Sequence, residues 1–112
     1  MEVQINQQEM FDLHNRARKR NLEIDDSLLA YAQEWAYKMN HEGIRHHSTI
    51  KKLLGKWNSV AENIAWGSSD SWVIFDGWMK SAGHRENIMN ENFQYVGIGL
   101  SGGCWCTVFA KE

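Results

Sequence analysis

Apolar residues near the start of the chain recur at helical spacing. Met10, Leu13 and Ala17 lie three or four residues apart. Asn6, followed three residues later by a glutamate, has the form of a capping box, in which side chains satisfy the first free N–H groups of a helix. The pattern therefore predicts a first helix that is capped by Asn6 and ends near residue 20.

A second helix is predicted in the segment that follows. Asp25 or Asp26 can cap it, and Gly43 is a suitable stop. Residues 44–59 have no clear period, so we expect a loop there, with one helical turn around residues 50–54. The apolar stripe of the second helix consists of Leu28, Ala32, Trp35, Ala36 and Met39.

The middle of the chain contains one extended segment and two short helices. Residues 60–66 alternate weakly and end at Gly67, which predicts a short strand. Trp72, Phe75 and Met79 then recur at helical spacing behind cap-type residues. A break at residues 81–83 precedes a short helix that bears His84.

The end of the chain has the pattern of a hairpin. Residues 95–100 and 105–110 predict two antiparallel strands, and Gly102-Gly103 between them is a turn signal. A chain with helices first and strands last is typical of an α+β fold, in which helices pack on a small antiparallel sheet.

Length and charge exclude several classes of protein. The chain has 112 residues, so we expect a single domain over residues 1–112. With 43% hydrophobic residues it is not a disordered chain, and with a net charge of -2 it lacks the basic footprint of a nucleic-acid-binding protein. No apolar run reaches the ~20 residues of a membrane-spanning helix. Residues 1–4 do not resemble a signal peptide, so the protein is expected either to stay inside the cell or to have lost a leader.

The two cysteines are separated by a single residue. On a strand, Cys104 and Cys106 would point to the same side of the sheet, but a disulfide between them would be strained. We therefore predict two reduced, buried thiols that behave as small hydrophobic side chains.

Several short patterns occur in order along residues 9–110. They are His14-Asn15-Arg16-Ala17-Arg18, Arg45-His46-His47-Ser48, Ala61-Glu62-Asn63-Ile64-Ala65-Trp66-Gly67, Ser81-Ala82-Gly83-His84-Arg85-Glu86-Asn87 and Val96-Gly97-Ile98-Gly99. Their order and spacing resemble the CAP superfamily, which contains cysteine-rich secretory proteins, antigen 5 and plant pathogenesis-related proteins. The chain is most similar to the short bacterial-type, SCP-like branch. The resemblance implies a CAP-type α-β-α sandwich, with helices on both sides of a small antiparallel sheet.

The chain departs from the family pattern at one position that matters for chemistry. Animal and plant members carry a second histidine just before the last strand, in a Gly-His-Tyr pattern. This chain has Gly103-Cys104-Trp105 there instead. The resemblance to the bacterial-type branch makes His84 the candidate replacement.

The resemblance places five residues in one cleft: His47, Glu62, His84, Ser48 and Asn63. Two neutral imidazoles and a carboxylate suit zinc or another divalent cation, so His47, His84 and Glu62 are the candidate metal ligands. The same groups could also do acid–base work. On the residues alone, a polar cleft whose groups hydrogen-bond to one another and to water is the favoured explanation.

Several of these residues have a simpler structural interpretation. Glu62 can accept backbone N–H bonds from a neighbouring loop, and Asn63 can brace a loop with its amide. Ser48 beside His47 invites a comparison with a Ser/His/Glu protease, but adjacent residues rarely provide the geometry for nucleophilic attack. His14, on the first helix, is interpreted as a core or interface residue.

We expect a binding or interaction module with a His/Glu cleft, and the sequence leaves the ligand open. The alternatives are a metal-dependent hydrolase of peptide or cell-wall substrates, and a sterol or fatty-acid carrier, both suggested by the resemblance. The partner is therefore a small ligand, including a lipid, or a protein, and no catalytic residue is assigned. Family resemblance predicts an extracellular or cell-surface location, with the cytoplasm as the alternative.

Overall fold

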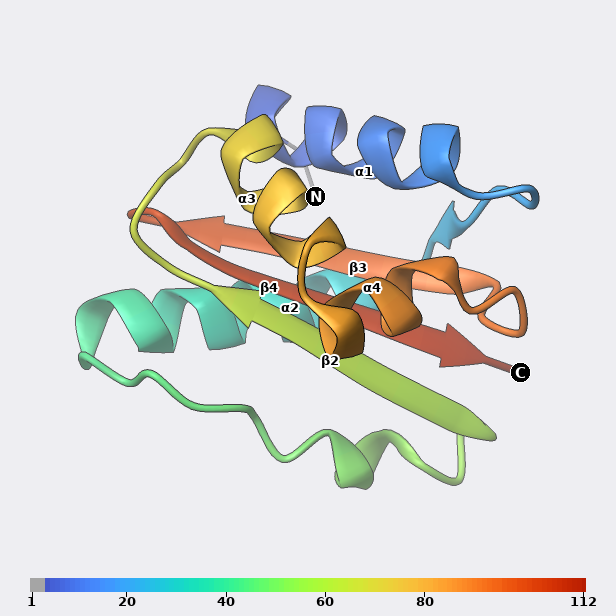
Figure 1. The fold of residues 1–112 in the computed structure, drawn as a ribbon. Helices are drawn as coiled ribbons and strands as arrows, with labels where there is room; N and C mark the ends of the chain where they lie inside the picture. Colours follow the sequence, from blue (N-terminus) through green and yellow to red (C-terminus); the bar gives the residue numbers. More distant parts are fainter. Residues whose placement is uncertain (1–3) are drawn as a thin grey trace.

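A four-stranded sheet separates two helical layers (Figure 1). The structure is a computed structural model that describes residues 4–112. Strands β3 and β4 form the C-terminal hairpin, β4 pairs with β2 on its other side, and both of these pairings are antiparallel. The order across the sheet is β1-β3-β4-β2, with bounds β1 Glu23–Ile24, β2 Ser59–Ala65, β3 Tyr95–Ser101 and β4 Cys104–Lys111.

The helices divide unequally between the two faces of the sheet. Helix α2 (Asp26–His41) lies on one face, and α1 (Ile5–Ala17), α3 (Ser71–Met79) and α4 (Ala82–Met89) lie on the other (Figure 1). A short 3-10 helix, η1 (Ile50–Leu53), interrupts the loop between α2 and β2. The expected α+β sandwich is therefore confirmed over the described residues, and positions 1–3 of the predicted domain lie outside them.

Two local predictions need correction. The sheet is mixed, not purely antiparallel, because the short strand β1 pairs in parallel with β3. Strand β1 has only two residues, too few for an alternating pattern, and it is held by backbone hydrogen bonds to the Gln94 and Val96 carbonyls. Helix α1 is capped by Gln4 and Gln7 in place of Asn6 and Glu9, and it ends at Ala17, three residues earlier than the pattern predicts.

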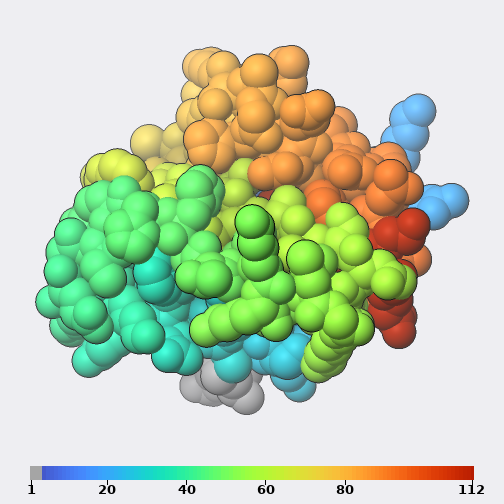
Figure 2. Space-filling model, turned by 90° about the horizontal axis from the view of Figure 1, so that it is seen from below, coloured from blue at the N-terminus to red at the C-terminus, as the bar shows by residue number. Residues whose placement is uncertain are grey.

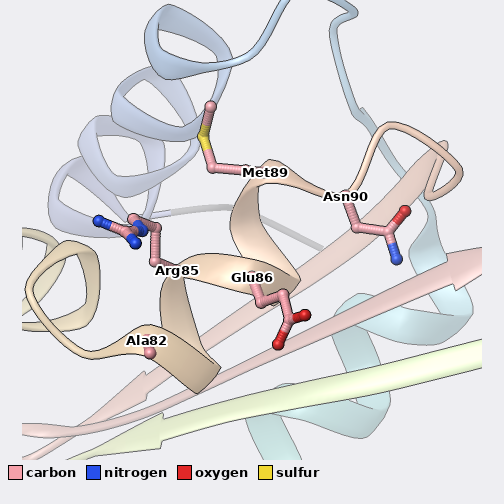
Figure 3. Close-up of a pocket in the computed structure, with 5 residues that line it drawn as sticks. All are labelled: Ala82, Arg85, Glu86, Met89 and Asn90. Carbon is pink, nitrogen blue, oxygen red and sulfur yellow. The ribbon is translucent and has the colours of Figure 1, made fainter.

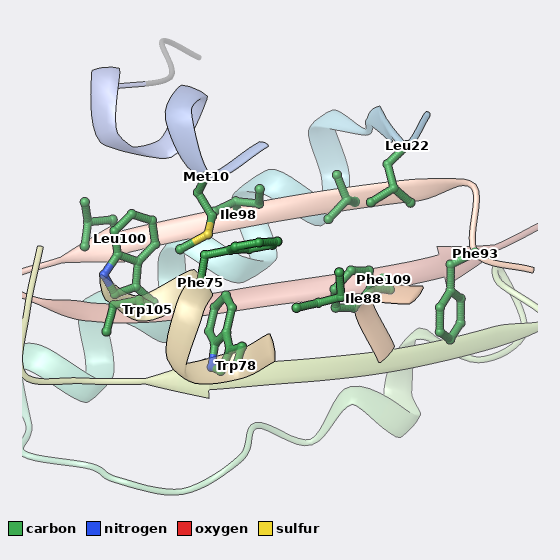
Figure 4. Packing of buried hydrophobic residues seen from close by; sticks show 12 residues of the cluster. Met10, Leu22, Phe75, Trp78, Ile88, Phe93, Ile98, Leu100, Trp105 and Phe109 are labelled. Atoms are coloured by element: carbon green, nitrogen blue, oxygen red, sulfur yellow. The ribbon is translucent and has the colours of Figure 1, made fainter. Parts of the chain in front are cut away.

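Strand β4 supplies the two cores through the alternation of its side chains. Trp105 and Phe109 face α1, α3 and α4, where they join the cluster drawn in Figure 4. Cys104 and Cys106 point the other way, into the cluster under α2. Both cysteines are free and buried, as predicted, and burial raises the pKa of the Cys106 thiol well above its ordinary value. A thiol in this environment is an inert core side chain.

Helix α2 lies so close to β3 that two positions of the strand have no room for a side chain. A Cβ atom on Gly97 would lie well inside 3.0 Å of the Leu28 backbone, and one on Gly99 would meet the Ala32 backbone in the same way. The alternating glycines of β3 thus set the distance between the sheet and α2.

His14 is completely buried in the layer formed by α1 and α3. Its ring lies 5.2 Å from the ring of Phe75 and 5.7 Å from that of Phe109, measured between centroids. Nδ1 donates to the Met10 carbonyl at 2.7 Å, whereas Nε2 has no hydrogen-bond partner among the described residues. Burial, with a smaller contribution from the charge of Arg18, lowers the pKa of His14 to about 4. His14 is therefore a neutral core residue, as the sequence predicted.

Acid should destabilise the fold through His14. The pKa of His14 is about 4 in the folded chain, against an ordinary value of 6.5 that we assign to the unfolded chain. Between pH 6.5 and pH 4, His14 is therefore protonated in the unfolded chain but not in the folded one. The free energy of unfolding should therefore fall as the pH drops from 6.5 to 4, by about 3 kcal/mol in total. Urea denaturation at a series of pH values measures this slope. His14→Leu should reduce the pH dependence of the free energy of unfolding, whereas His41→Gln, at an exposed site, should leave this dependence unchanged. A pH dependence in His14→Leu equal to that of the wild type would contradict the assignment.

Candidate functional site

The candidate site is built around β2, which is an edge strand of the sheet. Adjacent residues on a strand point to opposite faces, so Glu62 and Asn63 serve different layers. Glu62 is paired with Val108, which belongs to the cluster under α2, and Asn63 is paired with Thr107. The site therefore lies across the edge of the sheet.

Glu62 holds the loop that follows α2. Its Oε1 accepts from His47 Nδ1 at 2.7 Å and from the Ser48 backbone N–H at 3.0 Å. Its Oε2 accepts from the Ser48 hydroxyl and, at 3.6 Å, from the Cys106 thiol. The Glu62 side chain is 1% exposed, while that of His47 is 61% exposed. The expected loop-bracing role of this carboxylate is thus present, together with a direct contact to the histidine.

The contact with Glu62 fixes the tautomer of His47. A carboxylate can only accept, so the proton of the neutral imidazole sits on Nδ1, and Nε2 keeps its lone pair. A carboxylate in this position orients histidines that bind metals. His47 therefore presents Nε2 as a base or ligand on an exposed ring.

Ser48 does not pair with His47 in the manner of a protease. Its hydroxyl donates to Glu62 and accepts from the Tyr31 hydroxyl at 2.8 Å. The imidazole of His47 is bound to the carboxylate, not to this hydroxyl. Ser48 is therefore the middle member of a chain from Tyr31 to Glu62, and its hydroxyl is not paired with the imidazole as in a Ser/His couple.

Asn63 fastens α4 to the sheet. Its Nδ2 donates to the backbone carbonyl of His84 at 3.1 Å, and its Oδ1 accepts from Asn87 Nδ2 at 2.9 Å. Asn63 is completely buried. It therefore positions the backbone that carries His84 and is itself out of reach of a ligand.

His84 approaches the site from the layer opposite Glu62. Its ring stacks on Trp78 with centroids 6.4 Å apart, and Nδ1 is hydrogen-bonded to the Ser81 hydroxyl at 2.8 Å. Burial lowers the pKa of His84, and the charge of His47 lowers it further. His47 is thus close enough to disfavour the protonated form of His84.

The donor set suits a divalent cation only in part. Both oxygens of Glu62 are already engaged by His47, Ser48 and Cys106. Within residues 4–112, no group of three or more His, Cys, Asp or Glu side chains is arranged to hold a metal ion. The imidazoles of His47 and His84 are of the kind that zinc accepts, and in this arrangement Glu62 would orient His47 and not ligate.

Two residues of the network were missed by sequence reasoning. Tyr31 lies in the α2 segment, where nothing in the apolar pattern marks its hydroxyl as a partner of Ser48. Asn87 falls inside a quoted motif, three residues after His84, but its partner Asn63 is distant in sequence. Only the fold shows either contact.

A hollow on the described surface lies elsewhere on α4. Its volume is about 600 Å³, and it is lined by Ala82, Arg85, Glu86, Met89 and Asn90 (Figure 3). It is wide open to solvent and is lined by none of the five residues expected in the cleft. Its two charged side chains have opposite sign, which gives it no preference for a charged ligand.

Comparison with known proteins identifies the family. A sequence model of the cysteine-rich secretory protein family, CAP, matches residues 11–109. The chain belongs to the CAP family. This confirms the resemblance drawn from the motifs, and the match spans the loop, β2 and α4, which carry the candidate site.

Relatives and solved structures agree with this membership. The CAP domain is 29% identical over 118 residues to YkwD of Bacillus subtilis, covering 92% of this chain and 46% of that protein. It also matches a SCP-domain-containing extracellular protein of Bacillus anthracis with a TM-score of 0.87 and 26% identity, covering 96% of this chain and 40% of the other. An outer surface protein of Borrelia burgdorferi has the same fold, with a TM-score of 0.87, 22% identity, and coverage of 100% and 96%.

The chain spans less than half the length of the curated relatives it matches. Besides YkwD, half of the chain (50%) matches 16% of the Bacillus subtilis membrane protein YlbC, at 29% identity over 56 residues. Among residues 4–112, no helix is both long enough and apolar enough to cross a bilayer.

Proposed function

We propose that this CAP domain is a binding module whose site is the edge of β2, where His47 and His84 together hold a divalent cation. The observation that carries the proposal is the 2.7 Å contact from His47 Nδ1 to Glu62, since it leaves Nε2 free on an exposed ring. The influence of the His47 charge on His84 supports a shared site. Zinc is the cation that best matches two imidazoles.

The remaining coordination positions would be open to a ligand. Two side chains are fewer than the three that hold zinc in enzymes, so the ion would be bound weakly and would leave room for a partner's donor atom. This favours a module that recruits a ligand over an efficient hydrolase, which needs a placed nucleophile and transition-state donors as well.

Calorimetric titration with zinc tests the proposal. Wild-type protein should bind one zinc ion, and His47→Ala or His84→Ala should weaken binding by at least about tenfold, because one imidazole alone makes a poor site. Glu62→Gln should also weaken zinc binding, by a factor of ~10. The amide can still orient the imidazole of His47, but it lacks the negative charge of the carboxylate.

The control is His41→Ala, which removes an exposed histidine at the end of α2 that stacks on Tyr37. It should bind zinc as the wild type does. Denaturation curves of the Glu62→Gln variant must be recorded as well, because Glu62 also holds the loop at Ser48. Equal zinc binding by all four variants, or none by the wild type, would contradict the proposal.

The proposal includes a site of action outside the cell or on its surface. The Bacillus anthracis and Borrelia burgdorferi structures belong to an extracellular protein and an outer surface protein, respectively. Labelling of intact source cells with a membrane-impermeant amine reagent tests this location. If the protein in intact cells stays unlabelled, the proposed location is wrong.

A further inference from the structure

A second, smaller hollow lies between α2 and the segment that leads into η1. Its volume is about 240 Å³. One wall consists of α2 side chains spaced three or four residues apart, and the other consists of side chains from residues 48–52. The walls are Tyr31, Glu34, Trp35 and Lys38 on α2, and Ser48, Thr49 and Lys52 opposite.

Hydrogen bonds hold the aromatic side of this hollow in place. The Tyr31 hydroxyl donates to Ser48 Oγ at 2.8 Å, and Trp35 Nε1 donates to the His46 carbonyl at 3.1 Å. Both bonds tie α2 to the loop across from it. A site whose rings are already fixed loses little side-chain entropy when a ligand binds.

The charge in the hollow is not balanced. Lys38 Nζ lies 3.4 Å from Glu34 Oε1, so the charges of these two side chains cancel. Lys52 has no such carboxylate partner among the described residues, and its Nζ lies 5.3 Å from the centre of the Tyr31 ring. The hollow therefore offers one ammonium group that is free for an anion.

The surrounding surface attracts anions as well. Residues 43–61 contain Arg45, Lys51, Lys52 and Lys56 and no aspartate or glutamate, although the whole chain has a net charge of -2. Figure 2 shows this segment, in green, across the face between α2 and α4. Charges of one sign gathered around a hollow raise the local concentration of an oppositely charged ligand.

We propose that this hollow binds a small ring molecule that carries a carboxylate. The carboxylate would meet Lys52, and a flat face of the ring would lie against the half-buried Trp35. The volume is below the ~300 Å³ at which pockets for drug-sized ligands begin, so a single ring fits better than a larger molecule. A sugar acid and an aromatic acid share this chemistry.

This site is distinct from the cation site proposed above. It shares Tyr31 and Ser48 with the network around Glu62, but neither His47 nor His84 lines it. Binding should therefore occur in the absence of any metal, so failure of one proposal does not affect the other.

Proton–nitrogen NMR of the metal-free protein tests the proposal. The reporter is the indole N–H of Trp35, which is in the wall of the hollow. Sodium glucuronate and sodium benzoate are titrated at constant ionic strength, with glucose and benzyl alcohol as their neutral counterparts. At least one acid should shift this signal with saturation, and it should bind at least about fivefold more tightly than its neutral counterpart. Binding of glucuronate would identify the ligand class as sugar acids, and binding of benzoate would identify it as aromatic acids.

Two neighbouring lysines provide a matched pair of variants. Lys52→Gln removes the free ammonium, whereas Lys51→Gln removes an exposed charge of η1 that does not line the hollow. Affinity for the acid should fall by at least about fivefold in Lys52→Gln and by less than about twofold in Lys51→Gln. No saturable shift with either acid, equal binding of the neutral counterparts, or equal losses in the two variants would overturn the proposal.

Discussion

Gly97→Ala should be among the most damaging single substitutions in this chain. The added methyl group would meet the backbone of α2 at Leu28, well inside 3.0 Å, and a backbone cannot turn aside as a side chain can. Ordinary overpacking costs ~1–3 kcal/mol, and here α2 as a whole would have to move. We expect the free energy of unfolding, measured by urea denaturation, to fall by at least about 4 kcal/mol.

The matched control is Gly77→Ala in α3. A Cβ atom at Gly77 meets nothing within 4 Å, and the position is helical, where alanine is favoured over glycine. This variant should be as stable as the wild type or more stable by up to ~1 kcal/mol. Similar losses in the two variants would mean that contact between α2 and β3 is not the cause.

Arg18→Met should destabilise the fold by about 4 kcal/mol, because the guanidinium binds four backbone carbonyl groups that methionine would leave without its N–H donors. Nη1 donates to the carbonyls of Ile88 and Asn90 at 2.8 Å each, and Nη2 donates to that of Phe93 at 2.8 Å. Nε donates to the Arg20 carbonyl at 3.1 Å. Arg18 is 5% exposed, and its burial lowers its pKa. Methionine would fill much of the space but donate nothing.

Urea denaturation of Arg18→Met and of Arg16→Met separates this effect from a general loss of charge. Arg16 is exposed on α1, and its replacement should change the free energy of unfolding by less than about 0.5 kcal/mol. Hydrogen exchange should also be faster in residues 88–94 of Arg18→Met, where three of the four carbonyls lie. A loss in Arg16→Met as large as that in Arg18→Met would refute the assignment.

Patterns that depend on neighbouring residues were predicted well from the sequence. The α2 stripe from Leu28 to Met39 and the hairpin at Gly102-Gly103 both rest on local spacing, and both are present in the structure. The alternation in β4 also placed Cys104 and Cys106 on one face. Such patterns can be recognised in the sequence because the apolar face of a helix or strand has to be buried, and burial imposes a regular spacing on its residues.

Contacts that join distant segments could not be predicted in this way. The parallel pairing of Glu23 with Tyr95 leaves no trace in a two-residue strand. Family resemblance named His47 and Glu62 together, but the division of Glu62 between an imidazole, a backbone N–H, a hydroxyl and a thiol depends on the loop path. The hollow at Lys52 likewise depends on how α2 and the segment leading into η1 lie side by side.

The position of β4 in the sheet constrains when the domain can assemble during synthesis. Strand β1 pairs with β3, and β2 pairs with β4. Neither β1 nor β2 therefore has a partner in the sheet until the β3–β4 hairpin has been synthesised. Chains grow at roughly 5–20 residues per second, and non-local pairings of this kind form late in folding. While β4 is still inside the ribosome, Glu62 lies on a strand without its partner. The loop that carries His47 can be fixed only after β4 has emerged.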